Sequence, residues 1–139
     1  MKRFMPVFLF LLLFATPSFA QVRWGAHVGV TDGSGMIGGD VVLPLGNGFY
    51  FNPNVELSRK LISTNADFHY DISISRDTAY WIGAGAALVN PDGGDLDAGA
   101  NIIFGLAVRQ APRIFYTQLK YTIASNDNSF TTASFGVRF

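Results

Sequence analysis

Alternation of apolar and polar side chains is the feature that most restricts how this chain can fold. From residue 22 to the end, apolar residues recur at every second position in runs that Gly, Asn, Asp and Ser interrupt. A period of two is typical of a strand with one apolar face, whereas an amphipathic helix has a period near 3.6. The pattern predicts an all-β fold of eight strands, at 22–31, 36–45, 49–59, 67–76, 79–89, 97–108, 113–122 and 129–139.

The first twenty residues follow a different pattern. Lys2 and Arg3 precede an apolar stretch from residue 4 to residue 14, and small side chains stand near Ala20. We therefore expect residues 1–20 to be a secretory signal peptide cleaved after Ala20, and residues 21–139 to be one mature domain. The apolar stretch is too short for a membrane helix, which needs roughly 20 residues.

Composition narrows the classes of protein further. The sequence has no Cys, so burial or a closed backbone network must stabilise the secreted domain. Removal of Lys2 and Arg3 leaves eight basic against ten acidic side chains, a formal charge of −2. Without a basic patch, nucleic acid is not an expected partner. The longest remaining apolar run, residues 102–108, is far too short to cross a membrane as a helix.

The two faces of the expected strands differ in polarity. The segment 49–59, for example, sets apolar residues from Phe49 to Leu57 against Asn52, Asn54 and Glu56, while the faces of 79–89 stay unassigned because both are apolar or glycine. Eight strands enclose a space that side chains just fill, so a barrel in lipid would hold a polar plug and no wide pore. We expect Asp40 and Glu56 to pair with Lys120 and the arginines. The predicted lumen network is Arg23, His27, Asp40, Glu56, His69, Asp71, Asn101, Gln118, Lys120 and Arg138.

The connections between strands also alternate in length. Connections 46–48, 77–78 and 109–112 are short, whereas 60–66, 90–96 and 123–128 are longer, as at the two rims of a transmembrane barrel. Aromatic girdles are expected at both rims. At the short-turn rim these are Trp24, Phe49, Phe51, Tyr80, Phe115 and Phe139; at the other rim, Phe68, Tyr70 and Tyr121.

The chain ends on Phe139, with Val137 and Phe135 on the same strand face. With the signal peptide and eight alternating strands, this ending resembles small bacterial outer-membrane β-barrel proteins of the porin-like, OmpA-like or OmpX-like kind. The resemblance implies an eight-stranded antiparallel up-and-down barrel, in the outer membrane of a Gram-negative cell. It also implies that Phe135, Val137 and Phe139 form the signal read by the barrel-assembly machinery. Periplasmic chaperones and outer-membrane lipids, including lipopolysaccharide, are the other implied partners, and a monomer is expected.

Motifs for catalysis are sparse. His27 and His69 are the only histidines, and neither has a metal-ligand spacing, so no metal and no cofactor are expected. His69 and Asp71 share a strand face with Ser73 and Ser75, which suggests either a hydrolase triad or, as we favour, a hydrogen-bonded interior. The related deacylases carry a His-x-Ser-Asn signature that is absent here.

The sequence therefore favours a non-enzymatic outer-membrane barrel with a structural or surface-interaction role. Two alternatives stay open. A soluble periplasmic β-barrel would turn its apolar face inward and bind an apolar ligand. An outer-membrane lipid-modifying enzyme would use His69 with a serine.

Overall fold

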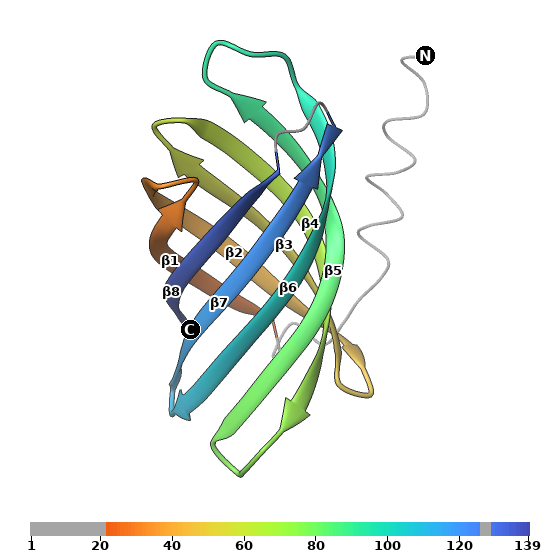
Figure 1. Ribbon diagram of the computed structural model, residues 1–139. Coiled ribbons are helices and arrows are strands. Elements are labelled where there is room, and N and C mark those ends of the chain that lie inside the picture. Colours follow the sequence, from red (N-terminus) through yellow and green to blue (C-terminus); the bar gives the residue numbers. More distant parts are fainter. Residues whose placement is uncertain (1–21, 126–128) are drawn as a thin grey trace, which may run out of the picture.

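The computed structural model describes residues 22–125 and 129–139, which form a closed barrel of antiparallel strands (Figure 1). Each strand pairs with the next along the chain, and β1 pairs with β8. The predicted eight-stranded up-and-down barrel is confirmed. The strands are β1 (Arg23–Thr31), β2 (Ser34–Gly46), β3 (Phe49–Ser58), β4 (Leu61–Ser73), β5 (Thr78–Pro91), β6 (Asp97–Gln110), β7 (Arg113–Ala124) and β8 (Phe130–Arg138).

The N-terminal prediction lies beyond this description. Residues 1–20 are outside the described residues, so the signal peptide stays a prediction. Within the described part of the chain, no helix is long and apolar enough to cross a membrane.

The seam between β1 and β8 closes the barrel. Its register runs from Gly25 opposite Arg138 to Thr31 opposite Thr132. Beyond the last strand, the Phe139 amide donates a hydrogen bond to the Trp24 carbonyl at 2.8 Å. Closure removes the free strand edges, and it pairs backbone groups that would otherwise face lipid without partners.

Two-residue turns join the first three strands. Asp32 and Gly33 have φ values of 47° and 70°, and Asn47 and Gly48 have φ values of 53° and 82°. Positive φ at both central residues defines the type I′ turn, which suits the right-handed twist of paired strands and favours Asn-Gly and Asp-Gly sequences. The Asp-Gly and Asn-Gly pairs therefore act here as local hairpin signals.

The prediction for the fourth strand, 67–76, was wrong at both ends. Ser58 Oγ accepts hydrogen bonds from the amides of Lys60 and Leu61 at 3.2 and 3.1 Å, so the chain turns at residues 59–60 and β4 begins at Leu61. The expected long connection 60–66 is therefore mostly strand. Its polar residues Ser63 and Asn65 are buried in the lumen, where polarity in the sequence does not indicate a loop. At the other end, residues 74–77 form the turn that was expected at 77–78.

This shift of β4 moves two aromatic residues to the other rim. Tyr70 lies opposite Phe49 and Phe68 lies opposite Phe51, with ring centroids 4.9 and 4.8 Å apart. The prediction that Phe68 and Tyr70 belong to the second girdle was therefore wrong. Tyr121, near the end of β7, does lie toward that second rim.

The structure also resolves the faces of β5. Ala79, Trp81, Ala87 and Val89 point inward and are buried. Trp81 fits because its neighbour across the strand pair is Gly105, where an added Cβ would overlap the indole ring. Two apolar clusters of buried residues thus enclose the polar lumen. They are Leu61, Ala87, Val89 and Phe130 at one end, and Trp81, Ile103, Ala107 and Tyr116 at the other.

Candidate functional site: a polar lumen with a charged vestibule

The outer surface of the barrel is apolar around its whole circumference. Large apolar side chains are exposed on every strand, among them Val28, Ile37, Val55, Phe68, Ile82, Phe104, Leu119 and Phe135. The buried ionic groups, including Asp40, Glu56 and Lys120, face the lumen instead. A soluble barrel has the reverse arrangement, whereas a barrel in lipid is apolar outside and polar inside. The alternative of a soluble protein with an apolar interior is therefore contradicted.

The six girdle residues predicted for the short-turn rim lie close to the chain ends of the barrel. Each stands within the first three residues of an odd-numbered strand or, for Phe139, directly after β8. Trp24, Phe49 and Phe139 are exposed. Phe51, Tyr80 and Phe115 are half-buried. Aromatic side chains gather at membrane–water interfaces, so the common level of these six residues is what a girdle requires, and the girdle itself stays a prediction.

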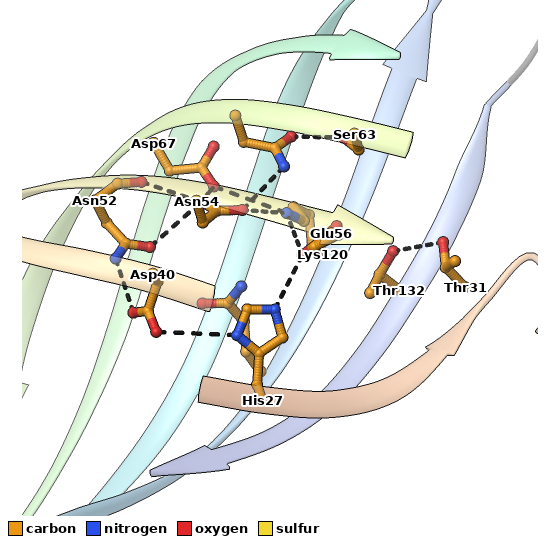
Figure 2. A network of polar contacts seen from close by, with 12 residues as sticks. His27, Thr31, Asp40, Asn52, Asn54, Glu56, Ser63, Asp67, Lys120 and Thr132 are labelled. Carbon is orange, nitrogen blue, oxygen red and sulfur yellow. Dashed lines mark hydrogen bonds and ion pairs between the residues drawn. The ribbon is translucent and has the colours of Figure 1, made fainter. Parts of the chain in front are cut away.

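Lys120 of β7 lies at the centre of the polar lumen. Its Nζ is 2.6 Å from Glu56 Oε1 and 3.9 Å from Asp67 Oδ2, and it donates a hydrogen bond to Asn54 Oδ1 at 3.1 Å. Lys120 and Glu56 are each 1% exposed. Figure 2 shows these side chains converging from β3, β4 and β7. The ammonium group thus neutralises charge contributed from the opposite side of the barrel.

A ladder of amides surrounds this ion pair. Asn54 Nδ2 donates to Asp67 Oδ2 at 2.9 Å, and Asn65 Nδ2 donates to Asn54 Oδ1 at 2.9 Å. Asn101 Nδ2 lies within hydrogen-bond distance of both Asn65 and Asp67, and Thr122 donates to Asn101 Oδ1 at 2.8 Å. The ladder fixes the acceptors around Lys120, because each amide both donates and accepts.

A second cluster centres on Asp40, nearer the short-turn rim. Asp40 accepts hydrogen bonds from Arg138 Nε at 2.8 Å, Asn52 Nδ2 at 2.9 Å and the Tyr116 hydroxyl at 3.1 Å. The Tyr116 hydroxyl also lies 3.0 Å from His27 Nδ1. His27 Nε2 is 3.8 Å from Glu56 Oε1, so the imidazole stands between the two clusters (Figure 2).

The structure gathers most of the predicted lumen residues inside the barrel. His27, Asp40, Glu56, His69, Asn101, Gln118, Lys120 and Arg138 are buried. Arg23 and Asp71 are half-buried at the short-turn rim. The sequence prediction omitted Thr31, Asn52, Asn54, Ser63, Asn65, Asp67, Tyr116, Thr122 and Thr132. Alternation had already set Asn52 and Asn54 on the polar face of their strand, and it would also have found Tyr116, which follows the outward-facing Phe115.

A cavity of about 290 Å³ opens at the short-turn rim of the lumen, and we call it the vestibule. Every strand contributes to its lining, which includes Arg23, Tyr50, His69, Asp71, Trp81, Arg109 and Arg138. The His69 ring stacks on Tyr50, with centroids 5.3 Å apart, and its Nε2 lies 3.4 Å from Asp71 Oδ1. The vestibule thus joins aromatic walls to a cluster of charged groups.

The hydrolase constellation suggested by the sequence does not assemble. Ser75 belongs to the turn after β4, so it does not share a strand face with His69 and Asp71. Its hydroxyl is 3.4 Å from the Asp77 amide, from which it accepts a hydrogen bond. Ser73 is exposed at the end of the strand. The described residues contain no group of three His, Cys, Asp or Glu side chains placed to hold a metal ion.

Comparison with known proteins identifies the fold. No protein-family model and no curated protein matches this chain. Among solved structures, the N-terminal β-barrel domain of Pseudomonas aeruginosa OprF matches with 18% identity and a TM-score of 0.73, over 85% of this chain and 95% of that one. Neisserial surface protein A matches with 16% identity and a TM-score of 0.68, over 84% and 94%. The outer-membrane enzyme PagL matches with 12% identity and a TM-score of 0.56, over 84% and 98%.

The chain therefore has the fold of the small eight-stranded barrels of bacterial outer membranes, as its C-terminal strand and alternation suggested. The fold and the continuous apolar exterior together give an outer-membrane location.

A charge at mid-height on the outer face tests this location. Leu119, in β7, is 54% exposed and pairs with Phe104 and Ala133. In lipid vesicles, Leu119→Arg should lower the free energy of unfolding by about 2–4 kcal/mol, since a cation there would face hydrocarbon. Ile123→Arg on the same face, nearer the end of β7, should cost about 0–1 kcal/mol. Equal costs in urea titrations of the two variants would contradict a membrane around this face.

Proposed function

We propose that this protein is a monomeric, non-enzymatic outer-membrane barrel with a structural or surface-interaction role, and that its lumen is plugged. The observation that carries the proposal is the buried ion pair between Lys120 and Glu56 in the middle of the lumen, with its ladder of amides. The fold leaves the role open, because the barrels of this shape include an enzyme. The environment of His69 argues against an enzymatic role. Its neighbours are the rings of Tyr50 and Trp81 and the Asp71 carboxylate, and none of these is the serine that the enzymatic alternative requires.

The two rims would have different surroundings. In outer-membrane barrels the short turns face the periplasm and the longer loops face outward. The turns 32–33 and 59–60 at the other rim are also short, but the longer connection 92–96 lies there, so the rim that carries the start of β1 and the end of β8 would be periplasmic. Residues 92–96, between β5 and β6, would be a surface loop, with Leu96 exposed for contact. Lipopolysaccharide and other outer-membrane lipids would surround the barrel, and chaperones and the assembly machinery would deliver it.

Fractionation of cells expressing the full chain tests the location and the closed barrel together. We expect the protein in the outer-membrane fraction and a faster gel migration without boiling, because a closed hydrogen-bonded barrel resists detergent. A soluble product whose migration does not change on heating would contradict the proposal.

Conductance in a planar lipid bilayer tests the plug. The wild-type barrel should show no wide-pore conductance, because Lys120, Glu56 and Asp67 fill the lumen. The triple variant Lys120→Ala, Glu56→Ala and Asp67→Ala removes the charged groups together and should conduct. A wild-type conductance equal to that of the triple variant would exclude a plug at this level.

Lipid analysis tests the absence of catalysis. Mass spectra of lipid extracts from cells with and without the protein should be the same. A modified lipid that depends on the wild-type protein and disappears in His69→Ala would support the enzymatic alternative instead.

A further inference from the structure

The vestibule has more positive than negative charge. Arg23, Arg109 and Arg138 line it from β1, β6 and β8, and Asp71 is the carboxylate among its lining residues. The Arg138 guanidinium is already engaged, since Nε donates to Asp40 and the group lies over the Tyr116 and Trp81 rings at 4.3 and 5.1 Å. The excess charge therefore comes from Arg23 and Arg109.

These two arginines have free hydrogen-bonding capacity. Among residues 22–125 and 129–139, neither side chain has a hydrogen bond or an ion pair within 4 Å, although the charges of both act on the Asp71 carboxylate from farther away. A guanidinium carries five N–H donors in a planar fork that fits the oxygens of phosphate, often with two parallel hydrogen bonds. Two such forks in one cavity are suited to a small oxyanion.

Two further polar groups at the vestibule have unused hydrogen-bonding capacity. His69 is 3% exposed, and its Nδ1 is buried with no hydrogen-bond partner among the described residues. The Asp71 carboxylate accepts no hydrogen bond from a described residue, and its Oδ1 lies near His69 Nε2 without hydrogen-bond geometry. A carboxylate can only accept hydrogen bonds while ionised, so its presence favours a ligand that itself donates.

We propose that the vestibule is a binding site for inorganic phosphate, held by Arg23 and Arg109 and selected by Asp71. Hydrogen phosphate keeps a proton at neutral pH, which it can donate to the Asp71 carboxylate. Sulfate has the same shape and charge but no proton, so one of its oxygens, an acceptor, would face the Asp71 carboxylate, which is also an acceptor. A volume of about 290 Å³ accommodates the ion together with bridging water.

The first experiment titrates the barrel, folded in a neutral detergent, with sodium phosphate and then with sodium sulfate at constant ionic strength. Isothermal calorimetry should show saturable binding of phosphate and at least about tenfold weaker binding of sulfate. If phosphate does not bind saturably, there is no such site. If sulfate binds as tightly as phosphate, Asp71 does not select the ligand.

Variants then distinguish binding of phosphate in the vestibule from attraction by general surface charge. Arg109→Gln and Arg23→Gln should each weaken phosphate binding by about tenfold or more, through loss of charge-assisted hydrogen bonds. The matched control is Arg113→Gln, because Arg113 stands near the same rim but lies over the Phe139 ring, 5.8 Å from its centroid, and is not part of the vestibule lining. Equal weakening in Arg113→Gln and Arg109→Gln would reduce the effect to nonspecific attraction.

Asp71→Asn provides the most specific readout. The amide can donate to an unprotonated oxyanion, so the preference for phosphate over sulfate should fall by about fivefold or more. An unchanged preference would contradict the role assigned to Asp71. Gel migration without boiling checks that each variant has folded. The result is independent of whether the mid-lumen plug conducts, because the vestibule lies on the rim side of it.

Discussion

Lys120→Met is expected to lower the free energy of unfolding by about 3–5 kcal/mol, the usual cost of leaving a buried charge without its partner. Lys120 Nζ is 2.6 Å from Glu56 Oε1, and both residues are 1% exposed. Methionine is similar in length and flexible enough to fill the same space. The loss therefore comes from the unpaired Glu56 carboxylate and not from a cavity. Urea unfolding in lipid vesicles, followed by tryptophan fluorescence, measures it.

A double variant identifies the cause of this loss. In Lys120→Met with Glu56→Gln the stranded charge is gone, and replacing both members of a buried pair by neutral groups is often close to neutral. The double variant should thus be more stable than Lys120→Met alone. Part of the loss in stability should remain, because Asp67, whose Oδ2 lies 3.9 Å from Lys120 Nζ, also loses its cationic neighbour. A single variant that loses less than about 1 kcal/mol would show that water reaches the pair.

The alternation of apolar and polar residues predicted most of the strands, because the outer side of the barrel wall is apolar and its inner side faces a polar lumen. In β3, outward residues from Phe49 to Leu57 alternate with the buried Asn52, Asn54 and Glu56, so the sequence pattern was clear. In the first half of β4 the pattern was hidden. Ser63 and Asn65 are lumen residues there, but Thr64 faces outward and Ser-Thr-Asn reads as a loop.

The faces of β5 were hidden for a different reason. Its inward positions hold Ala, Trp, Gly and Val, which are no more polar than its outward ones. Close packing explains part of this composition, since Trp81 lies against Gly105 on the next strand and an added Cβ at Gly83 or Gly85 would overlap β4. A glycine in a strand often marks such a close approach. Gly105 was therefore a signal in the sequence, but the sequence did not show that Trp81 packs against it.

The site was predictable as a set of residues and not as a set of contacts. The polar faces suggested which side chains enter the lumen, but Glu56 and Lys120 come from β3 and β7, 64 residues apart in sequence. Which of them meet depends on the closure and stagger of the whole barrel. The vestibule likewise combines residues from all eight strands, and no local motif connects Arg23 with Arg109.

Deletion of Phe139 should remove most of the assembled barrel from cells, while the purified variant still folds in detergent. The structure gives this residue a small part in stability. Its amide makes one hydrogen bond to the Trp24 carbonyl, and its ring is 62% exposed on the outer face, with the Arg113 guanidinium 5.8 Å from its centroid. One such bond contributes about 0.5–1.5 kcal/mol. A large loss in cells would thus reflect recognition of the terminal strand during assembly. Immunoblots of outer-membrane fractions measure it.

The control is Phe49→Ala, which removes an exposed aromatic ring at the same rim but away from the terminal strand. Phe49 contacts Tyr70, so its loss should cost at least as much stability as the loss of Phe139. If assembly followed stability alone, Phe49→Ala would assemble as poorly as the deletion variant. We expect it to assemble well, because Phe135, Val137 and Phe139 stay intact. Normal assembly of the deletion variant would instead refute the assignment of the terminal strand as a signal.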